Sequence, residues 1–252
     1  MTLLIIFIVI DVIAAVIAIA AQTNINNKYN KYAQASVYNG LTGKDVAENI
    51  LRDNQIDNIS VNAISGKLSD HYNHRKKELN LSQEIYNGST IAAIAVAAHE
   101  AGHAIQYKKR YVGIGVRNFV ITLSNIISTS TIPLLIIGIL FSTATLTLFG
   151  TNMGTLFIYI ALISYGATTL ASLVTLPVEF DASKRAMEEL RGMNILDEDE
   201  LDGTKSMLTA AALTYVANLA VNLIYLLRFV IILLLHSRDW HILNTKLAYK
   251  IW

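Results

Sequence analysis

The sequence of 252 residues contains no cysteine, and this absence restricts both its cross-linking and its metal chemistry. No disulfide framework can form, and any bound metal ion must be held by nitrogen and oxygen atoms. Charged residues are also scarce, at 15% of the chain against 53% hydrophobic residues, and the mean hydropathy is +0.43. This composition excludes an ordinary soluble domain and indicates a multi-spanning membrane protein. The net charge of only +1 gives no support for nucleic-acid binding.

The longest stretch that lacks Asp, Glu, Lys and Arg runs over residues 118–178. It is long enough for two crossings of a bilayer, and the Gly-Thr-Asn-Met-Gly sequence at 150–154 predicts a turn between them. We place the two spans near 128–149 and 155–176.

Two more apolar runs, at 3–21 and 207–235, are each long enough for one further crossing, so about four transmembrane helices are expected. No Lys or Arg precedes the first run, which favours an uncleaved anchor over a signal peptide. Asp11 interrupts this run, and a carboxylate in lipid is costly unless it faces protein. We expect it to bond to a polar residue of another span rather than to act in proton or substrate transfer. The candidate partners are Asn218, Asn222 and Arg228.

The most specific pattern in the chain is H-E-x-x-H, formed by His99, Glu100 and His103. One helix is predicted over 90–108, because a turn-forming Asn-Gly-Ser sequence precedes it and only Gly102 opposes helix formation. Four residues apart on a helix, His99 and His103 project from the same face and can bind one metal ion. Glu100 then lies beside the ion and can take a proton from a bound water, which is the general-base role in a zinc peptidase.

The alternative for this motif is a pair of core histidines whose ring nitrogens bond to backbone carbonyls. The residues at 91–98 are almost all Ala, Val and Ile, so the helix is apolar on every side and must be buried. Two histidines and a glutamate on a buried helix would be costly without partners, which favours the metal site.

A metal ion held by two histidines needs a third protein ligand, and Glu179 is the best acidic candidate. Pro177 suits the first position of a helix, so we expect a new helix to begin there with Glu179 in its first turn. Asp181 lies about 200° round the same helix and is expected to pair with Arg185. The Leu-Asp-Gly sequence at Asp202 matches the third-ligand motif of site-two intramembrane proteases, but it follows an acidic segment and is predicted to be a helix cap.

Three other residues could assist the site, and each has a common alternative role. His71 or His74 could be a further ligand or a donor to the tetrahedral oxyanion, although a histidine in a strand or turn is more often at the surface. Tyr215 could also donate to the oxyanion, although a tyrosine in an apolar helix more often packs or lies at an interface. His71 and Tyr215 are kept as candidates for binding the oxyanion or for orienting a metal ligand.

The segment 23–117 is predicted to be a small α+β unit around the metal-binding helix. A capping box that starts at Thr42 opens a short helix. Alternating residues predict strands at 58–64 and 77–81, linked through a basic, His-containing segment at 70–76. An exposed edge of this sheet could bind an extended peptide by strand addition.

The spans also predict the division of the chain. We expect a transmembrane anchor, the α+β unit, two transmembrane helices, the third-ligand helix with an acidic loop, and a C-terminal transmembrane helix with its tail. The corresponding residues are 1–22, 23–117, 118–176, 177–206 and 207–252. Two crossings between His103 and Glu179 return the chain to the same side of the bilayer. Most Lys and Arg residues lie on that side, so the positive-inside rule predicts a cytoplasmic metal site.

These residues resemble the YugP-type membrane zinc metallopeptidases of bacteria, and the similarity runs nearly end to end. The longest and most specific shared blocks are the metal-binding helix at 96–106 and the segment that contains Leu-Pro-Val-Glu-Phe-Asp-Ala-Ser, at 175–183. Shorter shared blocks lie at 30–32, 40–43, 79–82 and 210–216. The resemblance implies that His99, His103 and Glu179 bind zinc and that Glu100 is the catalytic base.

The chain is also distantly similar to the HtpX-type proteases and the prenyl-protein endopeptidases, in which a Glu after the spans completes the site. In those families an Asp follows that Glu by four positions. Ser183 stands at that position here, so the role of that Asp is not carried over. His74 stands where YugP-type proteins usually have proline, so no role for its loop is carried over either.

The sequence therefore predicts a mainly α integral membrane protein with about four transmembrane helices and a small α+β, gluzincin-like metallopeptidase unit. One Zn²⁺ ion is the expected cofactor, although Mn²⁺, Co²⁺ or Fe²⁺ could occupy the same ligands. The expected partners are a peptide or membrane-protein substrate and the lipid of a bacterial cell membrane. Two other functions stay open at this stage, namely hydrolysis of non-peptide amides or esters, and a non-catalytic role in membrane assembly with a structural metal.

Overall fold

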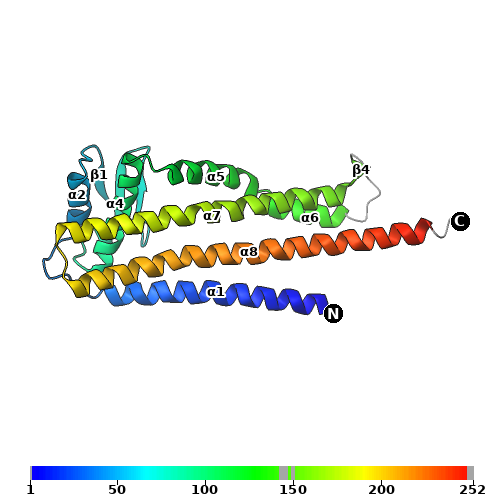
Figure 1. Cartoon of the computed structure of the whole chain (residues 1–252), viewed down its shortest axis with the longest axis horizontal. Coiled ribbons are helices and arrows are strands. Elements are labelled where there is room, and N and C mark those ends of the chain that lie inside the picture. The colour runs from blue at the N-terminus through cyan, green and yellow to red at the C-terminus, as the bar shows by residue number, and fades with distance from the viewer. Residues whose placement is uncertain (1, 142–146, 149–150, 249–252) are drawn as a thin grey trace. The chain divides into compact units, whose positions relative to one another are not determined.

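The computed structural model describes residues 2–141, 147–148 and 151–248, which are mainly helical (Figure 1). The helices are α1 (Thr2–Tyr32), α2 (Gly43–Asp53), α3 (Gln83–Asn87), α4 (Ile91–Lys108), α5 (Val112–Ser128), α6 (Thr131–Phe141), α7 (Met153–Met193) and α8 (Glu198–Ala248). The strands are β1 (Ser60–Ile64), β2 (His71–Asn73), β3 (Glu78–Ser82), β4 (Thr147–Leu148) and β5 (Thr151–Asn152). The predicted class, a mainly α protein with a small α+β unit, is confirmed.

Three of the described helices are long and apolar enough to cross a membrane, and they are α1 from Ile5 onward, α7, and α8 as far as Ile231. α5 and the first part of α6 meet at a bend of 41° and could together form a fourth span. On α1, the side chains of Val12, Val16 and Ile19 are between 55% and 64% exposed. Apolar side chains exposed in this way suit lipid rather than water, so the chain is a membrane protein, as its composition predicted.

The chain forms two compact units, which interleave along the sequence. The first unit contains residues 1–17, 118–173 and 218–252, and the second contains 18–117 and 174–217. The helices α1, α5, α7 and α8 contribute residues to both units. The domain boundaries expected from the sequence stay predictions.

In the first unit, polar side chains on apolar helices bond to one another. Arg228 Nη1 donates to Asp11 Oδ1, which confirms the expected bond between Asp11 and another span. Asn222 accepts from the Tyr165 hydroxyl at 3.1 Å and donates to Ser172 Oγ at 2.7 Å. Such bonds offset the cost of placing polar groups within apolar helices.

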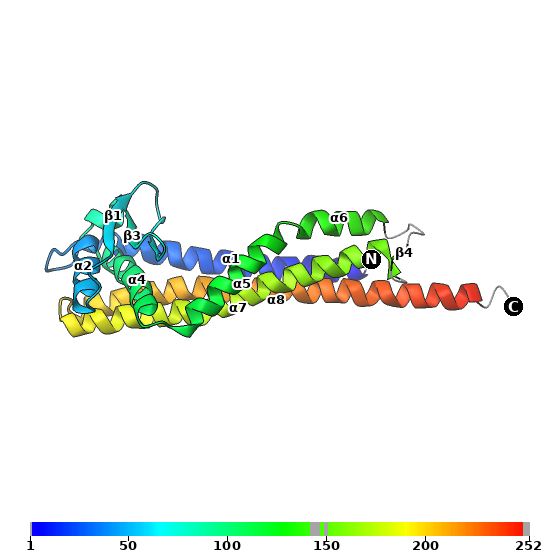
Figure 2. The same ribbon diagram turned by 90° about the horizontal axis from the view of Figure 1, so that it is seen from above.

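The sheet of the second unit has the strand order β1-β3-β2 and lies beside α2 and α4 (Figure 2). β1 pairs parallel with β3, with Ser60 opposite Glu78, and β2 pairs antiparallel with β3, with Tyr72 opposite Leu79. β3 is the central strand, and its Leu79 and Leu81 side chains are fully buried. β1 and β3 confirm the two expected strands. β2 falls in the segment expected to be a linker, because three residues are too few for alternation to indicate a strand.

α4 lies in the core of the second unit, with α2 and the sheet packed against it. The helix begins after Thr90, whose hydroxyl accepts a hydrogen bond from the Ala93 N–H at 3.2 Å. This helix confirms the one predicted over 90–108. The predicted capping box is also present at the start of α2, where Thr42 and Asp45 exchange hydrogen bonds at 3.2 and 2.9 Å.

Two predicted helix boundaries are wrong. Pro177 lies inside α7, a single helix of 41 residues, rather than at the first position of a new helix. A proline removes one backbone hydrogen bond, but an apolar helix packed among others tolerates this loss, so the residue is a weak boundary signal here. Asp202 lies inside α8 rather than at its cap. Asp197 caps that helix by exchanging hydrogen bonds with Glu200 at 2.8 and 3.0 Å, as in a capping box.

The turn expected between the two central spans is only partly described. β5 lies within the expected turn of 150–154 and pairs antiparallel with β4, and α7 begins at Met153, also within it, while residues 149–150 lie outside the described residues. Residues 142–146 of the preceding predicted span also lie outside them.

Candidate metal site

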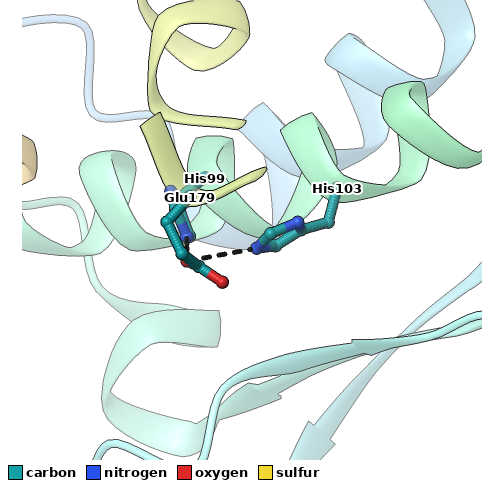
Figure 3. Close-up of side chains that lie close together, drawn as sticks. All are labelled: His99, His103 and Glu179. Atoms are coloured by element: carbon teal, nitrogen blue, oxygen red, sulfur yellow. Dashed lines mark ion pairs between the residues drawn. The ribbon is translucent and has the colours of Figure 1, made fainter. Parts of the chain in front are cut away.

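The two histidines of the motif lie one turn apart on α4 and face the same region (Figure 3). The centroids of their rings are 4.8 Å apart, and the ring planes meet at 82°. The side chain of His99 is 16% exposed and that of His103 is 12% exposed. The spacing of four residues in the sequence therefore produces the expected convergence of two imidazoles.

Glu179 reaches these histidines from α7 (Figure 3). Its Oε2 atom lies 3.3 Å from His99 Nε2 and 3.6 Å from His103 Nε2, and its side chain is 2% exposed. Ligand atoms of the three residues all lie within 4.8 Å of one another. Oε2 is buried and has no hydrogen-bond partner among the described residues. A buried oxygen without a donor, directed at two imidazole nitrogens, fits the ligand set of a His₂Glu metal site.

α4 and α7 approach each other closely at Gly102. A β-carbon at this position would lie 2.5 Å from the backbone oxygen of Ala182. Only glycine permits the two backbones to come this close. The close approach brings Glu179 within reach of His99 and His103.

Each histidine also has a partner on its other ring nitrogen. His99 Nδ1 lies 3.1 Å from Ser183 Oγ, and His103 Nδ1 lies 2.9 Å from Gln106 Oε1. Partners of this kind fix the orientation of the ring and leave Nε2 for a metal ion. No role was predicted for Ser183 or Gln106 from the sequence.

Gln106 links α4 to α7. Its amide nitrogen donates to Val178 O at 2.8 Å and to Asp181 Oδ2 at 2.7 Å. Arg185 Nε donates to the same carboxylate at 2.6 Å, which confirms the expected pair of Asp181 and Arg185. This network directs Gln106 Oε1 toward His103 and so orients the histidine ring.

Glu100 lies beside the histidines on the side of α4 that contacts β2. Its Oε2 accepts a hydrogen bond from the Tyr72 backbone N–H at 2.9 Å, and the residue is 9% exposed. Glu100 is not one of the three residues whose ligand atoms converge. The arrangement therefore provides a carboxylate next to the ligands that can accept a proton without binding the metal ion.

Arg117 and Tyr215 approach Glu179 from α5 and α8. Arg117 Nη2 lies 3.1 Å from Glu179 Oε1, whereas Oε2 is the oxygen near the histidines. The negative charges of Glu179 and Glu100 both act on the Tyr215 hydroxyl. The sequence pointed to Tyr215 but not to Arg117. Arg117 and Glu179 are the charged residues at the two ends of the uncharged stretch 118–178. Their positions at its ends could have indicated from the sequence that they form an ion pair.

His71 lies in β2, and its contacts are with other groups. Its Nδ1 lies 2.8 Å from Ser69 O, and its Nε2 lies 3.2 Å from Asn80 Nδ2. Side chains alternate along a strand, so His71 points to the face of β2 opposite Tyr72. A role for His71 at the oxyanion stays a prediction that these contacts do not support.

The charges around His103 raise its pKa. Burial alone favours the neutral ring and lowers the pKa. The negative charges of Glu179 and Glu100 and the hydrogen bond to Gln106 together outweigh burial. The two carboxylates therefore favour positive charge at this position, which also suits the binding of a cation.

Comparison with known proteins agrees with this geometry. The family model described as "putative neutral zinc metallopeptidase" matches residues 5–234. A protein of Bacillus subtilis (strain 168) described as "putative membrane protease YugP" is 35% identical over 234 residues, which are 92% of this chain and 98% of that protein. Comparison with solved structures gives no match. The chain belongs to the family described as "putative neutral zinc metallopeptidase".

Proposed function

We propose that this protein is a membrane zinc metallopeptidase that hydrolyses peptide bonds near the membrane surface. His99, His103 and Glu179 are the proposed ligands of one Zn²⁺ ion, and Glu100 is the proposed general base. The observation that carries this proposal is the position of Glu179 Oε2, which is buried near both Nε2 atoms without a hydrogen-bond donor among the described residues. Membership of a zinc metallopeptidase family supports the choice of ion.

When bound in this site, Zn²⁺ would supply a Lewis acid that acidifies water and polarises the carbonyl of the substrate. Glu100 accepts the proton of the attacking water at a carboxylate oxygen and passes it to the nitrogen of the leaving amine. The Tyr72 N–H holds Oε2 of that carboxylate and so fixes its direction. Three protein ligands leave a coordination position for water, whereas a structural zinc site uses four. This ligand count favours catalysis over a structural metal.

Arg117 and Tyr215 have supporting roles in this proposal. Arg117 holds Glu179 Oε1 and leaves Oε2 directed at the histidines. Its positive charge also reduces electron donation from the carboxylate, which would keep a bound ion acidic. The Tyr215 hydroxyl is the proposed donor to the oxyanion that forms on the substrate carbonyl.

We place the metal site at the cytoplasmic surface of a bacterial cell membrane, because the segments on its side of the spans carry most of the Lys and Arg residues. The lack of cysteine gives a clean background for testing this location. Tyr38→Cys introduces one thiol at a side chain that is 96% exposed and belongs to the unit of the metal ligands. A membrane-impermeant maleimide should label this thiol only after the cells are opened. Labelling in intact cells would contradict the cytoplasmic location.

Peptide hydrolysis by the purified protein tests the proposed function. Zinc-loaded wild type in detergent should cleave a mixed peptide library, and mass spectrometry identifies the products. Glu100→Gln should keep its zinc and lose at least about 100-fold in kcat/KM, because the general base is removed. Glu188→Gln changes a carboxylate that is 62% exposed and is the matched control, which should behave as wild type.

Equal cleavage by wild type and Glu100→Gln would contradict the proposal. Hydrolysis of amides or esters with no hydrolysis of peptides would also contradict it and would favour the non-peptide hydrolase.

A further inference from the structure

A hollow in the second unit lies between α4, β2 and the residues that precede β1. Its volume is about 560 Å³, which is within the range of pockets that bind small molecules. The three proposed metal ligands do not line it. The hollow therefore needs a separate explanation.

The floor of the hollow is apolar, and its rim is polar. Ala104 is 1% exposed and Ile56 is 8% exposed, and the side chains of Ile59, Tyr72 and Tyr107 are half-buried. The exposed polar residues of the rim are Gln55, Asp57, Asn58, Lys77 and Lys108. The rim charges are mixed in sign, and no charged residue contributes to the floor. A charged group would lose its hydration there without gaining a partner, so the floor suits an apolar group.

One wall of the hollow is aromatic. The Tyr107 ring meets the Tyr72 ring edge-on, with centroids 5.4 Å apart, and stacks on the His74 ring, with centroids 4.4 Å apart. Tyr72 lies in β2 and His74 directly follows this strand, and both rings contact Tyr107. Another aromatic ring can pack on such a wall in an edge-to-face or offset arrangement.

The hollow adjoins the proposed general base. The backbone N–H of Tyr72 donates to Glu100 Oε2 at 2.9 Å, while the Tyr72 side chain lines the hollow. Ala104 lies one helical turn beyond Glu100 on α4 and about 40° round the helix. The floor of the hollow therefore begins within one turn of the residue that would take the proton of the attacking water.

β2 also offers an edge along which a peptide can lie. It is an outer strand of the three-stranded sheet, and because the outward N–H of Tyr72 is already bonded to Glu100 Oε2, a peptide would pass beside this edge without pairing with that N–H. An extended peptide beside this edge would place alternate side chains on opposite sides. One of them would enter the hollow while the backbone passes the metal ligands.

We propose that this hollow is a substrate subsite that takes a large apolar side chain, with an aromatic ring preferred, close to the scissile bond. The inference rests on the proposed peptidase function and adds the class of residue that the enzyme selects. Asp57, Lys77 and Lys108 are assigned to the solvent-facing rim and do not recognise the substrate by charge.

Substitutions at Ile59 test the subsite, because this side chain lines the hollow, is half-buried and does not belong to the metal site. Ile59→Trp should fill the hollow. Ile64→Trp makes the same change in β1 outside the hollow and is the matched control. The zinc-loaded full-length proteins in detergent are given peptide pairs that differ only by Phe or Ala beside the scissile bond. Wild type and Ile64→Trp should prefer Phe by at least about tenfold in kcat/KM, and Ile59→Trp should lose this preference while it retains cleavage of the Ala peptide.

A binding measurement separates this inference from the proposed function. A peptide that carries p-benzoyl-phenylalanine is irradiated with the Glu100→Gln protein, and the cross-linked residues are mapped by mass spectrometry. Cross-links to Ile59, Tyr107 or their neighbours, lost in Ile59→Trp, support the subsite even if wild type proves to lack peptidase activity. Cleavage by wild type with unchanged preference in Ile59→Trp, or cross-links elsewhere, overturns the subsite and leaves the peptidase proposal in place.

Discussion

Substitution of Gly102 by alanine should damage the metal site because it forces α4 and α7 further apart. The new β-carbon would lie 2.5 Å from Ala182 O, whereas ordinary contact begins near 3.4 Å, so the backbones must separate by about 0.9 Å. Overpacking of this kind lowers the free energy of unfolding by about 1–3 kcal/mol. The better helix propensity of alanine offsets about 1 kcal/mol of this loss. The net loss of folding stability is therefore expected to be between about 0 and 2 kcal/mol.

The effect on the site should exceed the effect on stability. Glu179 is on α7 and the two histidines are on α4, so the separation lengthens the 3.3 and 3.6 Å distances between Glu179 Oε2 and the Nε2 atoms. A misplacement of about 1 Å can reduce catalysis by about 100-fold. We expect zinc affinity to fall by about 10-fold to 100-fold and kcat/KM by a similar factor.

Competition with a chromogenic zinc chelator measures the affinity, and thermal unfolding measures the stability. Gly166→Ala is the matched control, because a β-carbon at that position in α7 meets no atom within 4 Å. The control should bind zinc as wild type does. Unchanged zinc affinity and kcat/KM in Gly102→Ala would refute the reasoning that close helix packing sets the ligand distances.

Three further predictions follow from the contacts around the ligands. Gln106→Leu removes the partner of His103 Nδ1 and should weaken zinc binding by about 10-fold to 100-fold in the chelator competition. An unchanged zinc affinity would show that Gln106 does not orient the His103 ring. Arg117→Gln should retain about one zinc per chain but lower kcat by about tenfold or more, and an unchanged kcat would remove Arg117 from the mechanism. The pKa of metal-free His103 is raised above 6.5, and a proton competes with zinc for this ring. Zinc affinity should therefore fall as the pH is lowered through that raised pKa, and a constant affinity over that window would contradict the assignment of His103 as a ligand.

Local patterns explain why much of the site could be predicted from the sequence. The spacing of His99 and His103 fixes their common face once α4 forms, and both the helix and its Thr90 cap depend on neighbouring residues only. Glu179 could be found because it is the first acidic residue after a long uncharged stretch. Asp11 lies in an apolar helix and therefore needs a polar partner on another span. This need suggested three candidates from the sequence, and Arg228 is the one that bonds to Asp11.

The parts that could not be predicted depend on contacts between distant segments. Ser183 and Gln106 are ordinary polar residues, and only the packing of α4 against α7 places them on the histidine Nδ1 atoms. Arg117 resembled the other basic residues near α4 until its contact with Glu179 was located. Pro177 misled the prediction because a proline is tolerated inside a long apolar helix, where its usual meaning as a boundary is lost.

Zinc content of the purified full-length protein, measured by mass spectrometry of the metal, tests the central claim most directly. Wild type and Glu100→Gln should each carry about one zinc per chain, and Glu179→Ala should lose it. Glu179→Gln, with its thermal unfolding measured in parallel, controls for the loss of the charge that faces Arg117. Retention of zinc by Glu179→Ala would contradict the assignment of the third ligand and with it the proposed His₂Glu site.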